Sequence, residues 1–340
     1  MGYKVPVQRF LGVLVAAAFA TAAAAQAPSR LDAVRQRGAL TCGVLPKVQG
    51  FSHVDLSGRY TGFDVDICRA LAAAIFGDPE KVRFVEVGTI YAFIAQRGID
   101  VVSRRLTWGM SREQFGVLFG PVTFYDGQGF LVPKKLGIAR VAQLAGTRVC
   151  VESASLHETN LDVYVSESKL RIIKVLMPKL SETRGSFNAS ACTAYSADVS
   201  ELGAIRASLP KPDDFAILDE LISKEPLAQM VRSDDPVFFG ILRWTVHALI
   251  LAEELGVTSN NVDAMLKSSH PEVRRLLGVA DDTGRTFGLS ERWAYNIVKG
   301  VGNYAELFDR NVGAKSPIKL PRGLNRLWTD GGLLYAPPLQ

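Results

Sequence analysis

The side chains best suited to catalysis or metal binding form no recognisable set in this sequence. The four histidines, His53, His157, His247 and His270, show no H-x-x-H or H-E-x-x-H spacing. No G-x-S-x-G elbow, phosphate-binding loop or dinucleotide fingerprint occurs either. The sequence therefore predicts no catalytic residues, no metal site and no cofactor.

Other polar side chains lie where predicted strands end. Ser103, Arg104 and Arg105 follow the strand I-D-V-V, and Asp198 follows C-T-A-Y-S-A. Ligand groups in α/β sheets usually lie at the carboxyl ends of strands. Arg105 either contacts an acidic ligand or is a solvated surface charge, and Asp198 either binds a ligand or caps the helix predicted at Val199–Ser208. These positions are candidates for binding.

Strands and helices alternate along the chain in two successive sets. The strands of the first set are T-C-G-V-L, V-R-F-V-E-V and I-D-V-V-S, and those of the second are T-R-V-C-V, R-I-I-K-V-L and C-T-A-Y-S-A. Helices are expected between them, including 155–166 and a weak one at 181–188. This alternation predicts parallel α/β sheets. Because single cores stop growing near about 250 residues, we expect two lobes.

The last third of the chain is mainly helical. An apolar helix is expected at 244–255 and a long one at 291–308, interrupted by Gly300 and Gly302. The final stretch, P-R-G-L-N-R-L-W-T-D-G-G-L-L-Y-A-P-P-L-Q, is typical of a loop.

Residues 1–27 have the composition of an export signal. Lys4 and Arg9 precede the apolar run F-L-G-V-L-V-A-A-A-F-A, and small-x-small cleavage sites follow at 23–25 or 25–27. The run is shorter than the roughly 20 residues that a membrane span needs, which disfavours an anchor. We predict a Sec-type signal peptide and a mature protein in the periplasm, without membrane insertion after signal removal.

The net charge gives no indication of a nucleic-acid partner, and we predict none. Removing Lys4 and Arg9 from the formal net charge of +5 leaves +3. The surface is therefore only mildly basic, and no arginine-rich run or RNA-binding motif occurs.

Four cysteines in an exported protein suggest two disulfides, with three pairings allowed. They are Cys42, Cys68, Cys150 and Cys192. The nearest-neighbour pairing, Cys42 with Cys68 and Cys150 with Cys192, keeps each bridge inside one lobe, whereas a bridge between lobes would oppose a hinge. Four buried thiols are the alternative.

The stretch G-F-D-V-D-I-C-R-A-L-A-A-A-I, residues 62–75, predicts an amphipathic helix that ends at Gly77. Asp64 and Asp66 are expected to be solvated residues that favour the positive helix N-terminus. The whole stretch resembles the signature of the family 3 bacterial extracellular solute-binding proteins, the polar amino acid receptors of ABC importers.

Further stretches extend this resemblance over nearly the entire mature chain. Y-D-G-Q-G-F, I-S-K-E-P-L, L-A-E-E-L-G-V-T, W-A-Y-N-I-V-K-G-V-G-N-Y-A-E-L-F-D-R-N-V-G and G-G-L-L-Y-A-P-P are similar to the general L-amino-acid-binding subgroup. The resemblance implies a two-lobe, hinged periplasmic binding protein fold, type II-like, with a helical C-terminal extension. The implied lobes are 28–133 with 228–340, and 134–227.

The resemblance also implies how a free amino acid would be held. Arg112 matches the arginine that clamps the ligand carboxylate, and its planar fork can bind both oxygens. Thr107 matches a hydroxyl donor to the same group. Asp198 matches the aspartate that binds the ammonium. Ser155 opens a helix whose N–H groups can face an anion.

Other implied contacts are weaker, and the chain departs from the subgroup in several places. Ser103 and Arg105 lie at the end of the binding strand, and Phe51 and Tyr91 are candidate walls, although aromatics there are more often core. The departures are Arg105 and Leu106, where polar residues are normal, and Ala154 and Leu156, where glycine and threonine are normal. They affect the expected specificity more than the expected fold.

We predict a monomeric receptor, not an enzyme, that captures free L-amino acids between two lobes and delivers them to an inner-membrane ABC permease. Two alternatives are an exported small-molecule enzyme on the same fold, such as a dehydratase, and a soluble ligand-sensing adaptor.

Overall fold

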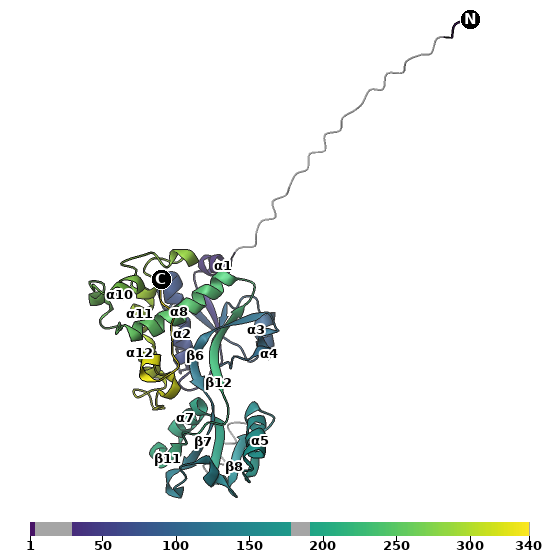
Figure 1. Cartoon of the computed structure of the whole chain (residues 1–340), viewed down its shortest axis with the longest axis vertical. Helices are drawn as coiled ribbons and strands as arrows, with labels where there is room; N and C mark the ends of the chain where they lie inside the picture. Colours follow the sequence, from purple (N-terminus) through teal and green to yellow (C-terminus); the bar gives the residue numbers. More distant parts are fainter. Residues whose placement is uncertain (4–28, 178–190, 340) are drawn as a thin grey trace.

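The computed structural model describes residues 1–3, 29–177 and 191–339. Most of the predicted signal peptide and the predicted helix 181–188 lie outside the described residues. The remainder folds into two lobes stacked along the long axis of the molecule (Figure 1). The two-lobed α/β prediction is therefore confirmed.

A five-stranded sheet organises each lobe among the described residues. In the first lobe the strand order is β4 (Val82–Glu86), β1 (Leu40–Val44), β5 (Val101–Val102), β12 (Glu225–Arg232) and β6 (Val117–Asp126). In the second lobe it is β11 (Phe215–Ile217), β7 (Gln128–Pro133), β10 (Ala194–Asp198), β8 (Arg148–Glu152) and β9 (Ile173–Met177). A small hairpin, β2 (His53–Val54) with β3 (Tyr60–Thr61), completes the described strands.

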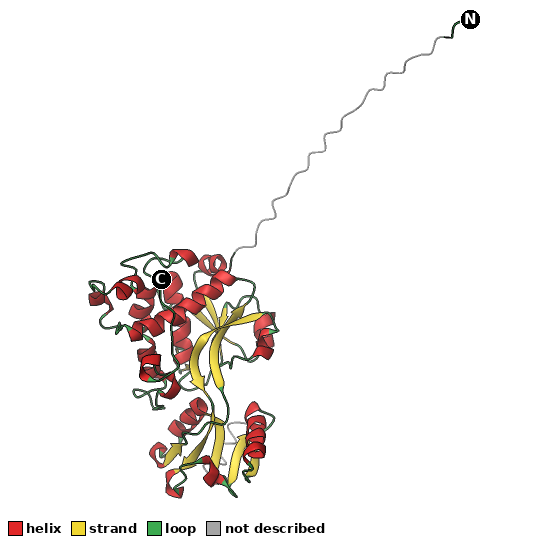
Figure 2. Cartoon of the chain, viewed as in Figure 1, coloured by secondary structure: helices red, strands yellow, loops and turns green. Residues whose placement is uncertain are grey.

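Most helices surround the sheet of the first lobe (Figure 2). They are α1 (Arg30–Arg37), α2 (Phe63–Phe76), α3 (Ile90–Ala95), α4 (Met110–Glu113), α8 (Pro236–Glu254), α9 (Val262–Met265), α10 (Pro271–Leu276), α11 (Trp293–Val301) and α12 (Tyr304–Asn311). The second lobe carries α5 (Leu156–Ser168) and α7 (Val199–Ser208).

The chain crosses between the lobes earlier than we predicted. β6 ends at Asp126 in the first sheet, and β7 begins at Gln128 in the second. The return lies between β11 and β12, before Glu225. The crossings are therefore near residues 127 and 218–224, instead of after 133 and 227. A Cβ at Gly127 would lie 2.7 Å from the Ser223 carbonyl oxygen, so a residue without a side chain lets the two connections pass closely.

The sheets are mixed, which corrects our prediction of parallel sheets. β1 is parallel to β4 and β5, but β12 is antiparallel to β5 and β6. In the second sheet β10 is parallel to β8 and antiparallel to β7. The antiparallel strands adjoin the crossings, because the chain leaves the first lobe along β6 and returns in the opposite direction along β12.

Helix α2 forms the centre of the first lobe. Its residues from Phe63 to Ile75 are all buried, and it ends at Gly77, whose left-handed φ of 73° lets its N–H bond the Ala73 carbonyl. The two acids of its first turn are also buried, which corrects our expectation that they are solvated. Their charges must therefore be compensated inside the protein.

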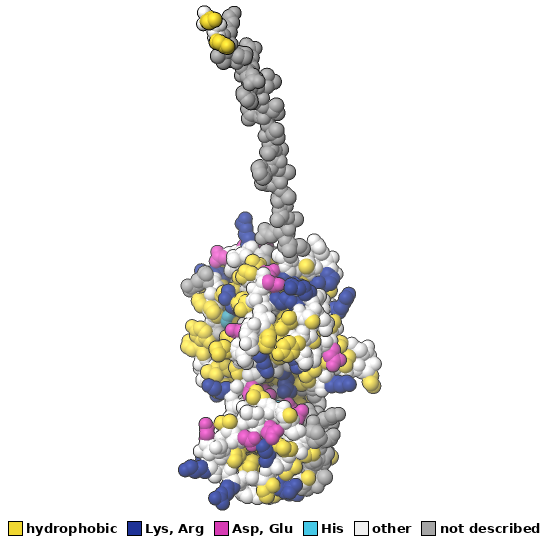
Figure 3. Space-filling model, turned by 90° about the vertical axis from the view of Figure 1, so that its right-hand side faces the viewer, with side chains coloured by type: hydrophobic (Ala, Val, Ile, Leu, Met, Phe, Trp, Pro, Cys, Tyr) yellow, Lys and Arg dark blue, Asp and Glu magenta, His cyan; other side chains and the backbone are white. Residues whose placement is uncertain are grey.

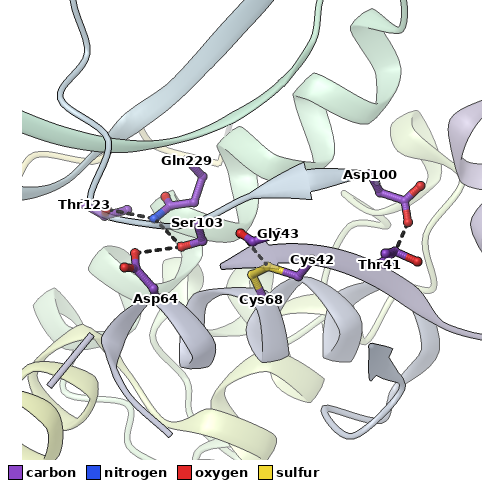
Figure 4. Close-up of a disulfide and its surroundings, with 9 residues drawn as sticks. All are labelled: Thr41, Cys42, Gly43, Asp64, Cys68, Asp100, Ser103, Thr123 and Gln229. Carbon is purple, nitrogen blue, oxygen red and sulfur yellow. Dashed lines mark hydrogen bonds between the residues drawn. A yellow bond between two sulfur atoms is a disulfide. The ribbon is translucent and has the colours of Figure 1, made fainter. Parts of the chain in front are cut away.

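Asp64 and Asp66 each connect α2 to a different part of the first lobe. The Asp64 carboxylate accepts a 2.9 Å bond from the Ser103 hydroxyl, which in turn accepts one from Gln229 (Figure 4). Asp66 accepts bonds from Arg310 and Asn311 at 2.8 and 2.6 Å. The first acid thus fixes the end of β5, and the second anchors α12.

Replacing Asp64 by asparagine is expected to flatten the pH dependence of stability. Burial raises the pKa of Asp64 to about 6 from 3.8, against the Ser103 bond, which lowers it. Because the folded-state pKa lies above the unfolded value, the stabilisation is full below pH 4 and is lost as the pH rises through 6. The loss is at most about 3 kcal/mol.

Urea unfolding of the wild type and the Asp64→Asn variant at pH 4.5 and pH 7.5 measures this effect. Ser103→Ala is the matched control, because removing the bond that lowers the Asp64 pKa is expected to steepen the dependence. An Asp64→Asn variant that loses as much stability with rising pH as the wild type would contradict the assignment.

The four cysteines form the two nearest-neighbour disulfides. Cys42 in β1 is bonded to Cys68 in α2, and Cys150 in β8 is bonded to Cys192 just before β10. The predicted pairing is confirmed, and the free-thiol alternative is wrong. Figure 4 shows the first bridge between strand and helix. Each disulfide lies within one lobe, so neither restrains movement between the lobes.

Helix α8 begins earlier than we predicted. Asp235 caps it by accepting a 2.8 Å bond from the Phe238 N–H, and Pro236 occupies the first turn, where its missing N–H costs nothing. By length and composition α8 is apolar enough to cross a membrane, but 67% of its apolar window is buried in the first lobe. It is a core helix.

The long helix predicted at 291–308 is two helices. α11 ends before Gly302, which has a left-handed φ of 84°, and α12 then starts with Asn303 as its cap. The break turns α12 toward the second lobe (Figure 1).

Candidate ligand-binding site

The Arg105 side chain extends from the first lobe and contacts acidic side chains of the second lobe. Its guanidinium lies 3.3 Å from Glu201 and 3.6 Å from Asp198, both in the second lobe. It also lies 5.5 Å from the centre of the Phe51 ring. Only 16% of its side chain is exposed, which excludes the solvated surface charge that we considered. Arg105 is therefore an interlobe residue.

Asp198 is held as an acceptor for cations and does not serve as a helix cap. It precedes α7, but its side chain makes no capping hydrogen bond. One carboxylate oxygen lies 3.0 Å from the His157 ring and the other 3.6 Å from Arg105. The capping alternative is therefore excluded, and the carboxylate faces the first lobe.

A second polar cluster joins the lobes near the return crossing. The Thr107 hydroxyl donates a 2.7 Å bond to Glu225, and Asn160 of α5 lies 3.4 Å from the other oxygen of the same carboxylate. Ser223 donates to Glu225 at 3.0 Å. Glu225 is buried. Through these bonds it connects Thr107 of the first lobe, Asn160 of the second lobe and Ser223 of the return crossing.

Arg112 lies beside Thr107, as the resemblance implies. Its guanidinium donates to the Thr107 carbonyl oxygen. No carboxylate among the described residues forms an ion pair with it within 4 Å. Arg104 is close enough for the charge of Arg112 to lower the pKa of Arg104, after the larger effect of burial. A guanidinium without a partner acid among the described residues, such as that of Arg112, favours an anionic ligand group.

Burial and charge shift the pKa values on the second-lobe side. Burial, followed by the charge of Asp198, raises the pKa of Asp126, which also accepts the Ser200 N–H. Burial opposes ionisation of Asp198, but the hydrogen bond and charge of His157 together hold the pKa of Asp198 below its usual value. Burial likewise opposes the charged form of His157, and Asp198 outweighs it, so the pKa of His157 is raised. The arrangement favours an ionised Asp198.

The surface of the junction carries both signs of charge. Figure 3 shows acidic and basic side chains at the narrow waist between the lobes. The first lobe contributes Arg104, Arg105 and Arg112, and the second contributes Asp198 and Glu201. The two faces are electrostatically complementary.

The other predicted residues do not all lie at this junction. Ser103 is fully buried, and its hydroxyl is bonded to Asp64 and Gln229 of the first lobe, so it lies inside that lobe and not at the junction. Tyr91 is 63% exposed and packs on Phe115. Phe51 is buried under Arg105, so it supports the site through that side chain.

Ser155 caps α5 by accepting the Glu158 N–H at 3.2 Å, and its hydroxyl donates to the Glu152 carbonyl. The residue before it, Ala154, has a φ of 55°, in the left-handed region that glycine adopts without cost. The departure from glycine therefore introduces backbone strain at the entrance to α5.

Sequence reasoning missed several members of the junction. Glu201 lies three residues after Asp198 on α7, and this spacing on one helix face was available as a signal. Glu225 and Asn160 meet only through long-range packing, so no local pattern indicated them. His157 was considered only as one of four histidines without a catalytic or metal-binding spacing.

Comparisons with known proteins agree with this architecture. Residues 40–286 match the family described as bacterial extracellular solute-binding proteins, family 3. The general L-amino acid-binding periplasmic protein AapJ of Rhizobium johnstonii is 44% identical over 96% of this chain and 97% of that protein. The glutamate/glutamine/aspartate/asparagine-binding protein BztA of Rhodobacter capsulatus is 41% identical over 97% of this chain and 98% of that protein.

A solved structure supports the fold of the whole chain. An ABC transporter periplasmic binding protein from Brucella ovis with glutathione bound has a TM-score of 0.84 and 41% identity, covering 92% of this chain and 100% of that one. The predicted periplasmic binding protein fold is thus confirmed. The prediction of a binding protein and not an enzyme is confirmed by the family and these relatives. By its sequence and its architecture, the chain belongs to the bacterial extracellular solute-binding proteins, family 3.

Proposed function

We propose that this protein captures a free L-amino acid between its lobes and delivers it to an ABC importer. The proposal rests mainly on Asp198, whose side chain does not cap α7. Its carboxylate faces a first-lobe surface on which Arg112 has no partner acid among the described residues. An α-amino acid carries the two opposite charges that these groups require.

In the proposed complex, Arg112 holds the ligand carboxylate and Asp198 holds the ammonium. The Thr107 hydroxyl is bonded to Glu225 in the present conformation, so it must turn away to reach the ligand. Arg105 already contacts Asp198, so a ligand ammonium competes with it or shares the carboxylate. Ser155 acts by orienting the start of α5, whose first N–H groups face the same region.

Entry of a ligand requires the lobes to separate. The contacts of Arg105 and Glu225 join opposite lobes and must loosen, while the connections near Gly127 and Ser223 bend. Closure then rebuilds these contacts around the ligand, which is the hinge behaviour of two-lobed binding proteins. Nothing covalent happens to the ligand.

The range of ligands is proposed to be broad and polar. AapJ is described as a general L-amino acid-binding protein, and BztA as binding glutamate, glutamine, aspartate and asparagine. The Brucella ovis relative holds glutathione, a peptide that contains a free α-amino acid end. The departures at Arg105, Leu106, Ala154 and Leu156 are expected to adjust affinity within this range.

The partners follow from the same assignment. We propose a monomer in the periplasm, exported by the predicted signal peptide, that docks on an inner-membrane permease. The transport energy would come from the ATPase of that importer. An adaptor role for a membrane sensor is the alternative that a negative ligand screen would favour.

A thermal-shift screen of refolded mature protein against the common L-amino acids and reduced glutathione tests this proposal. A ligand at a hundred times its dissociation constant is expected to stabilise the protein by about 2.7 kcal/mol. Stabilisation by several amino acids supports a broad receptor. Stabilisation by glutathione alone would replace the amino acid with a peptide ligand, and no shift at all would contradict the proposal.

A further inference from the structure

The segment that follows α12, residues 312–320, reaches from the first lobe to the second; we call it the strap. Its base is fixed on the first lobe, because Arg310 and Asn311 at the end of α12 are bonded to the buried Asp66. The Leu320 N–H returns to the Val312 carbonyl at 2.8 Å, which closes the strap into a compact loop.

The strap contacts α7, the helix of the second lobe that begins after Asp198. Arg206 of α7 donates to the Ile318 and Lys319 carbonyl oxygens at 2.8 and 3.3 Å. A Cβ at Gly203 would lie 2.8 Å from Ile318 and 2.9 Å from Leu320, so the helix and the strap approach as closely as glycine permits. In Figure 1, the yellow C-terminal segments lie next to α12, on the side that faces α7.

Ile318 touches both lobes at once. Its side chain is 1% exposed, and besides Gly203 it lies against Gly50 of the first lobe, where a Cβ would collide with it. Gly50 precedes Phe51, the ring beneath Arg105. Ile318 therefore fills the space between the wall of the candidate site and the helix that carries its acids.

The contact is limited in extent and therefore separable. A cavity of about 400 Å³ lies beside it, lined by strap residues including Pro317 and Lys319 and by second-lobe residues including Lys134 and Phe215. At this contact the two lobes are joined through Ile318, Leu320 and the Arg206 bonds, with the cavity beside them.

Helix α7 links the strap to the proposed ligand. Asp198 and Glu201 lie at its first turns and face Arg105, while Gly203 and Arg206 contact the strap. Because a helix moves as a rigid body, a contact at residues 203–206 restrains the position of residues 198–201. The strap acts on Asp198 from about one to two helical turns away.

We propose that Ile318 and Leu320 are positioning residues for ligand capture, which hold α7 against the first lobe so that Asp198 faces the ligand. This inference rests on the proposed function. The strap acts on the site through α7, by raising the fraction of molecules in the closed form. The apparent dissociation constant is the intrinsic one divided by that fraction, so every ligand gains by the same factor.

The test compares the double variant Ile318→Ala, Leu320→Ala with the wild type. Calorimetric titrations with L-glutamate, L-glutamine and L-alanine measure affinity, and small-angle X-ray scattering without ligand measures the radius of gyration. We expect affinity to fall by about tenfold for each amino acid that binds, with unchanged ratios between them, and the radius of gyration to increase.

Two further variants separate positioning from general destabilisation. Ile318→Val, Leu320→Met keeps apolar volume at the contact and is expected to restore near-wild-type affinity. Leu334→Ala is the matched control, because Leu334 is as buried as Ile318 and its backbone is bonded to Arg326 and Trp328 within the C-terminal part. It is expected to lower the melting temperature without changing affinity.

Unchanged affinity in a folded double variant would overturn the proposal, and so would altered ratios between amino acids, which would indicate direct contact. Failure of the proposed function is distinguishable, because the wild type would then bind none of the three amino acids. In that case the scattering measurement decides alone: a larger radius of gyration in the double variant supports the strap, and an unchanged one rejects it.

Discussion

Replacing Arg112 by methionine is expected to weaken amino-acid binding by at least about thirtyfold. Truncating one member of a desolvated charge pair costs about 2–5 kcal/mol, and among the described residues no other guanidinium donates to the Thr107 carbonyl oxygen. Methionine preserves most of the apolar part of the side chain, so the loss of affinity measures the contribution of the guanidinium group. Calorimetric titration of the refolded variant measures it.

Arg112→Lys is the matched control for this result. Lysine retains the positive charge but cannot bind both carboxylate oxygens through a planar fork. We expect an intermediate loss of about tenfold, in keeping with one charge-assisted hydrogen bond instead of two. An Arg112→Met variant that binds within threefold of the wild type would remove Arg112 from the site and would make the neighbouring Arg104 the alternative clamp.

Replacing Asp198 by asparagine is expected to weaken amino-acid binding by at least about thirtyfold as well. The carboxylate is nearly buried and its ionised form is stabilised by His157, so its charge is available to an ammonium. Asparagine keeps the shape and one acceptor oxygen but loses the charge. The affected ligand atom is identified if the variant loses affinity for amino acids and not for an N-acetylated analogue.

Glu201→Gln serves as the control for Asp198→Asn. It also removes an acid from Arg105, at 3.3 Å, but we assign it no contact with the ligand. We expect its affinity to change by less than about fivefold, because Arg105 keeps its contact with Asp198 at 3.6 Å and the ligand loses no contact. Equal losses in the two variants would mean that Arg105 pairing, and not an ammonium contact, explains the role of Asp198.

The elements that the sequence predicted well are those whose signals are local. The helix at 62–75 combines apolar spacing with a glycine stop, and both disulfides join neighbouring elements of one lobe. The crossing was misplaced because β7, Q-G-F-L-V-P, is as apolar as a strand of the first lobe and carries no mark of the sheet that it joins. Sheet membership is decided by long-range pairing.

The candidate site was predicted in part, for a related reason. Arg105 and Asp198 were recognised as binding candidates because they follow strands. The alternatives for them, surface charge and helix cap, were settled only by the contact between the lobes. Ser103 was predicted at the site and lies beneath it, because Asp64, expected to be solvated, is buried and binds it. Glu225 joins residues far apart in sequence, so local pattern gave no indication of it.

The central claim is that one ligand bridges the lobes by its two charged ends. The most direct test is calorimetric titration of the refolded wild type with L-glutamine, with its carboxyl amide and with N-acetyl-L-glutamine. The account predicts that L-glutamine binds and that both derivatives bind at least about thirtyfold more weakly, because each leaves Arg112 or Asp198 unpaired. Binding of either derivative as tightly as the parent, or no binding of L-glutamine, would contradict it.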